Sequence, residues 1–305
     1  MNAGFFLKKT KTDDVVNISC SVSNREIDKV SKWLIPSLIK QKEIKKINLY
    51  LFNYDGTKDL VYNGPSQVDN ISIKEFNKFE QCGFGESHNF VFKEINPSDN
   101  FLIINPDVYL HEYCIYEMLS ALKNDTNVGC VEARQLPFEH PKKYDLNTME
   151  TSWASNFCVM MKPDVFSKIG GYDENFWMYC EDVDISWRIL IQGYKVIYCP
   201  NAVAYHYTGA YFEYSPSRFY LEHYWGARNF IYLSYKFFGL RGEIKAKRLL
   251  NGMNYPDNFK KEIIYSFEKA KEKSGDYFYK KNNKKIKELY KMIKVTSFNQ
   301  YHENF

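Results

Sequence analysis

The 305-residue sequence has no apolar run long enough to cross a membrane as a helix. Its longest runs, such as residues 101–104 and 158–161, fall far short of the ~20 residues that a spanning helix needs. In residues 1–14 the charges follow a short apolar patch, whereas in a signal peptide they precede the apolar region. We therefore expect neither a signal peptide nor a transmembrane segment.

The sequence also lacks CxxC pairs. It has seven cysteines, at positions 20, 82, 114, 130, 158, 180 and 199. An odd number of widely spaced cysteines argues for free thiols in a reducing compartment and against a zinc site. We therefore expect a cytoplasmic protein.

Internal repeats and low-complexity linkers are absent as well. The composition is 45% hydrophobic and 17% aromatic. A chain of this size and composition can bury a substantial core, either as one large domain or as a domain with an appendage.

Positive charge is concentrated near the C-terminus. Residues 241–305 contain 16 Lys and Arg against 8 Asp and Glu, whereas residues 1–240 contain 25 against 29. The apolar residues of this region recur at helical intervals and are Phe259, Ile263, Ile264, Phe267, Leu289, Met292 and Ile293. We predict a domain at 1–240 and a basic helical extension at 241–305. An anionic membrane surface, rather than nucleic acid, is the partner that we expect for it, and a solvated helical face is the alternative.

Apolar runs alternate with helical patterns along residues 15–207, which favours an α/β domain with a largely parallel sheet. Strands are predicted at 15–23, 46–53, 101–105, 128–134, 156–162, 195–199 and 202–207, and helices at 29–41, at 111–124 and from 181 onward. Parallel sheets bind ligands beyond the carboxyl ends of their strands. The polar residues at these ends, which we predict to line a ligand site, are Asn24, Asn53, Asp55, Asn105, Asp107 and His206.

Three carboxylates, Glu181, Asp182 and Asp184, occupy the first turn of the helix predicted from residue 181. Acidic side chains at a helix N-terminus complement its dipole, and Asp184 lies four residues before Arg188, within pairing distance. Alternatively, the aromatic residues of segment 172–179 wall a partly dry cleft in which a carboxylate acts as a base or ligand.

Asp107 follows Asn105 and Pro106 at the end of an apolar strand. A lone Asp in such a place is commonly a turn residue or helix cap, but it also suits Mg²⁺ or Mn²⁺ when a diphosphate supplies further oxygens. His206 is either a satisfied core histidine or a third ligand beside Asp107 and the diphosphate.

Residues 82–89, CGFGESHN, contain Gly83 and Gly85 after a possible strand at 72–76. Paired glycines permit a close backbone approach to a phosphate, and a tight turn is the alternative. We interpret His88 as a surface residue.

Together these motifs carry a family resemblance. Residues 16 to about 235 resemble the family 2 inverting glycosyltransferases of the GT-A fold, most closely the rhamnosyltransferases of bacterial surface-polysaccharide synthesis. The motifs, in the family's order, are GFGESHN, FLIINPDV, GGYDENFWMYCEDVDISWRILIQGYKVIYCPNAVAYHY and FYLEHYWGARNFIYL.

The resemblance implies a set of roles. Asp107 becomes the metal-contacting member of a variant DxD motif, with Mg²⁺ or Mn²⁺ as cofactor, and Asp182 becomes the catalytic base. Glu181 and Asp184 orient the site. Ala154 or Ser155 faces the transferred sugar, for which L-rhamnose from dTDP-rhamnose is the best assignment. The implied acceptor is a glycan or lipid-linked oligosaccharide at the inner face of the membrane.

The sequence also departs from the family pattern. Asn53-Tyr54, followed by Asp55, stands where the family has an Asp-Asn pair, and Glu80 or Gln81 replaces an Asn before the glycines. The alternatives are a UDP- or GDP-sugar donor, a nucleotidyltransferase, and an inactive carbohydrate-binding relative.

Overall fold

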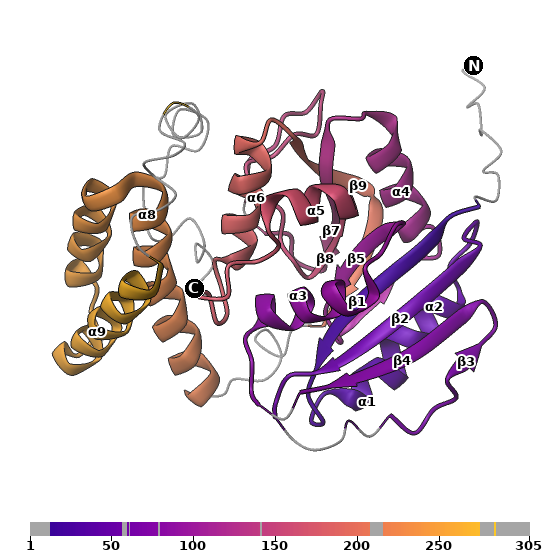
Figure 1. The fold of residues 1–305 in the computed structure, drawn as a ribbon, viewed down its shortest axis with the longest axis horizontal. Helices are drawn as coiled ribbons and strands as arrows, with labels where there is room; N and C mark the ends of the chain where they lie inside the picture. The colour runs from indigo at the N-terminus through magenta and orange to yellow at the C-terminus, as the bar shows by residue number, and fades with distance from the viewer. Residues whose placement is uncertain are drawn as a thin grey trace.

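The structure is a computed structural model that describes residues 13–56, 60, 62–78, 80–140, 142–207, 216–274 and 284. Within these residues the strands form one nine-stranded sheet in the order β3-β4-β2-β1-β5-β8-β7-β9-β6 (Figure 1). The strands are β1 (Val15–Val22), β2 (Lys46–Asn53), β3 (Gln67–Val68), β4 (Ile71–Asn77), β5 (Asn100–Ile104), β6 (Val108–Leu110), β7 (Val128–Leu136), β8 (Cys158–Met161) and β9 (Lys195–His206). The helices are α1 (Ile27–Lys29), the π-helical η1 (Val30–Leu34), α2 (Ile35–Ile39), α3 (Phe84–Ile95), α4 (Cys114–Asn124), α5 (Pro163–Ile169), α6 (Glu181–Ile191), α8 (Pro216–Gly252) and α9 (Asp257–Ser274).

The strands that position the site run parallel. Strands β4, β2, β1 and β5 pair in parallel, and so do β7 and β9. Strand β8 is antiparallel to both β5 and β7, so these two also run in the same direction. The carboxyl ends of β1, β2, β5, β7 and β9 therefore meet at one edge of the sheet, and the predicted largely parallel α/β architecture is confirmed.

Alternation along the strands separates two apolar layers. In β5, Leu102 and Ile104 belong to the core that includes residues of α2 and α4, whereas Phe101 and Ile103 belong to the core that includes residues of α3, α5 and α6. Successive side chains of a strand point to opposite faces of the sheet. The sheet is thus covered by helices on both faces.

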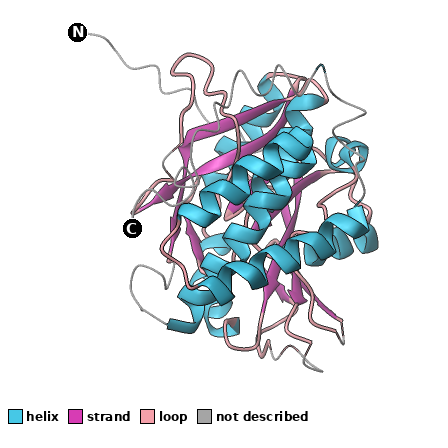
Figure 2. Cartoon of the chain, turned by 90° about the vertical axis from the view of Figure 1, so that its left-hand side faces the viewer, coloured by secondary structure: helices cyan, strands magenta, loops and turns pink. Residues whose placement is uncertain are grey.

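A third apolar cluster joins α8 and α9 to α6. It contains Val183 and Trp187 of α6, Phe237 of α8, and Phe259 and Phe267 of α9. Figure 1 shows α8 and α9 to one side of the sheet, next to α6, and Figure 2 views the molecule from that side, with helices in front of strands. The C-terminal helices therefore pack against the domain.

Helix α8 is interrupted at Gly239, which has φ 60° and ψ −150°. The predicted boundary between residues 240 and 241 lies beside this kink, inside α8. Phe259, Ile263 and Phe267, three residues of the predicted apolar stripe, are buried in the cluster with α8. Leu289, Met292 and Ile293 lie outside the described residues.

Several elements differ from those predicted. Residues 195–206 form one strand, whose pairing with β7 shifts register between Cys199 and Val203, around Pro200. The sequence analysis predicted two separate strands here, at 195–199 and 202–207. Residues 84–95 and 163–169 form helices that the sequence analysis did not predict.

Two further predictions concern the cysteines and membrane-spanning helices. All seven cysteines are free and buried, as expected. No helix in the described ranges combines the length and apolar composition that crossing a bilayer requires.

Candidate active site

Asp107 and His206 lie together at the carboxyl edge of the sheet. Strand β6 pairs antiparallel with β9 in a register that sets Val108 opposite His206 and so brings Asp107 beside it. The Oδ1 atom of Asp107 lies 3.2 Å from Nε2 of His206. Burial opposes ionisation of Asp107, but the hydrogen bond and charge of His206 and the charge of Lys29 bring its pKa below the ordinary value. Asp107 is therefore a carboxylate at neutral pH.

The His206 ring is fixed on three sides. Its Nδ1 lies 3.0 Å from Oε1 of Gln135, its Nε2 lies 3.2 Å from Nδ2 of Asn105, and it stacks on Phe157 at a centroid distance of 5.2 Å. Because the Gln135 oxygen only accepts, Nδ1 donates to it, and Nε2 is the ring nitrogen that faces Asp107.

The pair fits a divalent cation. Two neighbouring ligands at about 2.1 Å from an octahedral ion lie about 3 Å apart, close to the observed 3.2 Å. Within the described ranges no group of three or more His, Cys, Asp or Glu residues could hold a metal. A cation at Asp107 and His206 would therefore need water and phosphate oxygens as well.

A second polar cluster follows β1 and β2. The backbone N–H of Asn24 donates to Oδ2 of Asp55 over 3.2 Å, and the N–H of Asp55 donates to Oδ1 of Asn53 over 3.3 Å. Lys29 lies 3.8 Å from Glu26 of the same region and 3.6 Å from Asp107. The predicted residues at the ends of β1, β2 and β5 are therefore neighbours.

The acidic helix begins as predicted, with Glu181 as the first residue of α6. Asp182 is half-buried, and burial raises its pKa to about 6 against the opposing effects of the Val183 N–H and the Lys142 charge. Glu181 is 7% exposed, and burial together with the charge of Asp182 raises its pKa well above the ordinary value. With a pKa of about 6, Asp182 is ionised at neutral pH.

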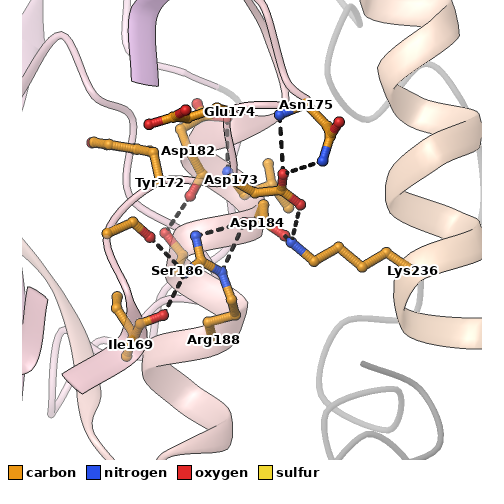
Figure 3. Close-up of polar contacts among 12 residues, drawn as sticks. Ile169, Tyr172, Asp173, Glu174, Asn175, Asp182, Asp184, Ser186, Arg188 and Lys236 are labelled. Carbon is orange, nitrogen blue, oxygen red and sulfur yellow. Dashed lines mark hydrogen bonds and ion pairs between the residues drawn. The ribbon is translucent and has the colours of Figure 1, made fainter. Parts of the chain in front are cut away.

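Asp184 belongs to a buried ion-pair network (Figure 3). Its Oδ2 lies 2.8 Å from Nε of Arg188, and its Oδ1 lies 2.6 Å from Nζ of Lys236, on α8. Arg188 also donates to the carbonyls of Ile169 and Gly171. Two cations hold Asp184, as the predicted pairing with Arg188 implied, and the network ties α6 to its surroundings.

Residues 154–157 connect Asp182 with the metal-fitting pair. The N–H of Ala154 donates to Oγ of Ser186 over 3.0 Å, and that hydroxyl donates to the backbone oxygen of Asp182 over 2.7 Å. Phe157, at the other end, stacks on His206. Three residue steps span at most about 11 Å. Residues 154–157 thus extend from the first turn of α6 to the ring of His206.

Ser155, in the same segment, contacts a histidine that the sequence analysis did not single out. Its Oγ lies 3.1 Å from Nε2 of His140. Burial, followed by the positive charges of Lys142 and His206, lowers the pKa of His140 to about 3. His140 is therefore neutral and lies between the two halves of the site.

The sequence analysis also missed a buried ion pair, Lys142–Glu132, whose side chains are 3% and 2% exposed. The amine of Lys142 lies 4.1 Å from the centroid of the Trp153 ring, and its charge lowers the pKa of Asp182. The signal was available, because Glu132 is a charge inside an apolar strand, and a buried charge needs a partner.

The two glycines have packing roles. A Cβ at Gly83 would lie 2.6 Å from the backbone oxygen of Trp177, and one at Gly85 would lie 2.6 Å from Cβ of Tyr172. The N–H of Phe84 donates to the same Trp177 oxygen. The close approach that these glycines allow is therefore to segment 172–177. Gly83 is the N-cap of α3, and the expected tight turn is in fact the start of this helix.

The interpretation of His88 as a surface residue was wrong. The ring is fully buried, and its Nδ1 lies 2.7 Å from Oγ of Ser19 on β1. Burial lowers its pKa to about 3, so it is a neutral core histidine. The helical position of His88, one turn after Phe84, places it on the face of α3 toward the sheet.

No family model matches this chain. Among curated proteins, the O-antigen chain rhamnosyltransferase WbaN of Salmonella anatum is 25% identical over 173 residues, which are 50% of this chain and 53% of the relative. RfbN of Salmonella typhimurium, also an O-antigen chain rhamnosyltransferase, is 24% identical over 194 residues, 55% of this chain and 59% of the relative. A Mycobacterium tuberculosis N-acetylglucosaminyl-diphospho-decaprenol L-rhamnosyltransferase is 36% identical over 55 residues, 18% of each chain. The chain thus spans less than two thirds of the length of these relatives.

Solved structures share the fold. A mannosyltransferase from Pyrobaculum calidifontis, solved with GDP-Man and Mn²⁺, aligns with a TM-score of 0.55 at 11% identity over 98% of this chain and 91% of its own. GalNAc-T7, solved with UDP, GalNAc and Mn²⁺, gives the same TM-score and identity over 87% of this chain and 57% of its own. The GT-A fold predicted from the motifs is confirmed.

Proposed function

We propose that this chain, a rhamnosyltransferase-like protein of the GT-A fold, is an inverting glycosyltransferase that moves a sugar from a nucleoside-diphosphate donor to a glycan or lipid-linked oligosaccharide. One observation carries the proposal. Residues 154–157 link a half-buried, ionisable Asp182 to an Asp107–His206 pair with the spacing of two cation ligands. A base at Asp182 and a diphosphate site at Asp107 and His206, joined by this segment, would serve the attacking hydroxyl and the leaving diphosphate of a displacement reaction.

Asp182 is the proposed base. Inverting transfer requires a group that accepts the proton of the acceptor hydroxyl while that oxygen attacks the anomeric carbon opposite the leaving diphosphate. A pKa of about 6 leaves Asp182 ionised at neutral pH and more basic than an ordinary carboxylate. Burial and the charge of Asp182 raise the pKa of the adjacent Glu181 well above the ordinary value. Asp184 positions α6 through Arg188 and Lys236.

The donor is assigned to the carboxyl ends of β1, β2 and β5. We place its nucleoside near Asn24, Asn53 and Asp55, and its diphosphate near Asn105 and Asp107. Mg²⁺ or Mn²⁺ held by Asp107 and His206 would neutralise the charge of the leaving diphosphate. Ala154 or Ser155 faces the sugar. The names of the sequence relatives support L-rhamnose, carried by dTDP, as the sugar.

The names of the relatives also support a biological setting. One relative is named for the O-antigen chain and another for N-acetylglucosaminyl-diphospho-decaprenol. We therefore propose that the protein works in the cytoplasm, at the inner face of the membrane. Glu132 and Lys142, which interact electrostatically with Asp182, and His140, which contacts Ser155, are the candidates for the acceptor side of the site.

The test is donor binding. Thermal shifts are measured with dTDP, UDP and GDP, each with Mn²⁺ and with EDTA, for the wild-type chain and for Asp107→Ala. The metal-dependent part of the dTDP shift should disappear in Asp107→Ala, because the phosphates and the remaining carboxylates would repel one another without the cation. Asp99→Ala, which removes an exposed carboxylate, is the matched control.

Two results would contradict the proposal. One is a wild-type shift of equal size in Mn²⁺ and EDTA, which would leave Asp107 as a structural residue. The other is the absence of a shift with all three nucleotides. A larger shift with UDP or GDP than with dTDP would change the donor and keep the reaction type, and turnover of dTDP-rhamnose by the wild-type chain then decides the sugar.

A further inference from the structure

Helix α8 holds the segment that leads into Glu181 and Asp182. Asn229 of α8 donates both amide hydrogens to consecutive carbonyls of that segment, over 2.7 Å to Met178 and 2.8 Å to Tyr179. The neighbouring Arg228 donates from Nη1 to the carbonyl of Asn175 over 2.5 Å. Asn229 is 0% exposed and Arg228 6% exposed. A buried amide with both donors used in this way fixes the orientation of two peptide planes.

These peptide planes belong to a strained turn. Tyr179 has φ 71° and Cys180 has φ 65°, so two consecutive residues with side chains adopt the left-handed conformation that favours glycine. Cys180 makes no side-chain hydrogen bond as the N-cap of α6. Such a conformation persists only where the surrounding structure imposes it. Here the contacts from Asn229 lie on the residue before the turn and on its first residue.

The rest of the contact between α8 and this region does not depend on Asn229. Lys236 lies 2.6 Å from Asp173, and the Tyr232 hydroxyl donates to the same carboxylate over 3.2 Å. The Phe176 ring packs edge-on against Tyr232 at a centroid distance of 5.0 Å. The helix therefore stays docked on segment 173–176 when Asn229 is changed, and the effect is confined to residues 178–182.

We propose that Asn229 is a positioning residue for the base: it imposes the left-handed conformation at residues 179 and 180 and thereby sets the position of the Asp182 carboxylate. The proposal rests on the function proposed above for Asp182. It assigns α8 a role in the reaction step and none in donor binding, because Asn24, Asn53 and Asp107 lie at the ends of other elements.

The first measurement compares Asn229→Ala with wild type in transfer kinetics and hydrogen exchange. We expect kcat to fall by about 10- to 100-fold and the donor KM to stay within about twofold, since a small misplacement of a reacting group lowers the rate. Amide exchange in peptides covering 175–184 should rise while that of β1 and β5 peptides is unchanged. Asn251→Ala is the matched control, because Asn251 is an exposed residue of the same helix.

The second measurement is restoration. Glycine adopts the left-handed region without strain, so Cys180→Gly should recover much of the kcat that Asn229→Ala loses. Cys180→Gly alone should remain close to wild type. A general loss of folding in Asn229→Ala would also raise amide exchange in the β1 and β5 peptides, which separates positioning of the turn from a structural role of the side chain.

The outcomes separate this inference from the proposed function. Wild-type kcat in Asn229→Ala, a loss that Cys180→Gly leaves unchanged, or unaltered exchange at 175–184 would each overturn the role of Asn229. If wild-type protein neither bound a nucleotide nor turned over a sugar donor, the proposed function would fail, and with it the assignment of Asn229 to a base. The exchange data would still decide whether Asn229 imposes the turn.

Discussion

At the scale of single residues, Asp182 and Asp184 lie in the same helix turn, but their carboxylates have different surroundings. Asp184 is fully buried and faces two cations, so its charge is satisfied within the protein. Asp182 is half-buried, and its burial outweighs the stabilisation of the carboxylate by backbone N–H groups and the charge of Lys142, so its pKa rises. A carboxylate that is costly to ionise gains more by taking up a proton, and this is the property that a base requires.

We predict that Asp182→Asn abolishes transfer and leaves donor binding nearly unchanged. The substitution keeps the size of the side chain and removes its ability to accept a proton, and loss of a positioned base costs about 10²- to 10⁴-fold in rate. Initial rates and dTDP thermal shifts are the measurements. If Asp182→Asn kept near-normal turnover while Asp184→Asn was inactive, the role of base would pass to Asp184.

The pKa of Asp182 predicts a pH dependence. The base works when ionised, and its pKa is about 6, so kcat/KM should be level above pH 7 and fall about tenfold per unit below pH 6. Burial and the charge of Asp182 raise the pKa of Glu181 well above the ordinary value, so the acidic limb of the profile is assigned to Asp182. Rates from pH 4.5 to 8.5, with donor binding followed in parallel, test this. An acidic limb near pH 4, as for an ordinary Asp, would disagree with it.

At the scale of elements, the N-terminus of α3 illustrates a contact that no local pattern reveals. The motif GFGESHN left two alternatives open, a close backbone approach to a phosphate and a tight turn. In the structure it forms the start of helix α3, which packs closely against residues 172–177. The glycines serve a contact with a segment about 90 positions later in the sequence.

We predict that Gly83→Ala destabilises the protein by about 1–3 kcal/mol, because the new Cβ would lie 2.6 Å from the Trp177 backbone oxygen and the packing has no flexible side chain there to yield. The contact precedes Asp182 by five residues, so activity should fall too. Urea unfolding monitored by circular dichroism gives the free energy. Gly252→Ala is the control, since nothing lies within 4 Å of a Cβ at that position; equal stability of the two variants would refute the packing role.

Much of the fold was predictable from sequence because it depends on local periodicity. The strand at 46–53 has an apolar alternation that its burial largely follows, whereas β1 and α6 also bury polar residues such as Ser19 and Asp184. Candidate site residues were named where a polar residue ends an apolar strand, as at Asp107 and His206, and their roles stay predictions. The Asp107–His206 contact itself depends on the pairing of β6 with β9, which is a long-range register.

The remainder could not be predicted because it is set by partners distant in sequence. His88 appeared polar and exposed, but its burial depends on α3 packing over Ser19. The apolar stripe of residues 259–267 has the same pattern whether it meets lipid or protein, and only the position of α8 decides between them.

At the scale of the whole molecule, α9 is part of the folded unit. Phe259, Ile263 and Phe267 are 7%, 0% and 0% exposed. Burying such side chains contributes about 1.5–3 kcal/mol each, so together they approach the ~5–15 kcal/mol that stabilises a whole domain. Ion pairs of 2.7 Å between Lys271 and Glu243 and of 2.6 Å between Lys247 and Glu268 join the same helices. A chain ending at Gly252 should therefore aggregate or unfold, which makes it unsuitable for asking what the basic region binds.

A chain ending at Ser274 is suited to testing whether the basic region binds a membrane. It keeps α9 and removes seven lysines and three acidic residues, so it should retain the melting temperature of the full chain. An anionic membrane attracts about 1 kcal/mol per Lys near its surface, and a net charge of about four then corresponds to roughly a thousandfold in binding. We predict that the full chain sediments with anionic vesicles at low salt and releases at high salt, and that the chain ending at Ser274 does not sediment. Neutral vesicles are the control for apolar attachment. Equal sedimentation of the two chains would exclude residues 275–305 as the anchor, and failure of the full chain to bind at low salt would exclude electrostatic attachment altogether.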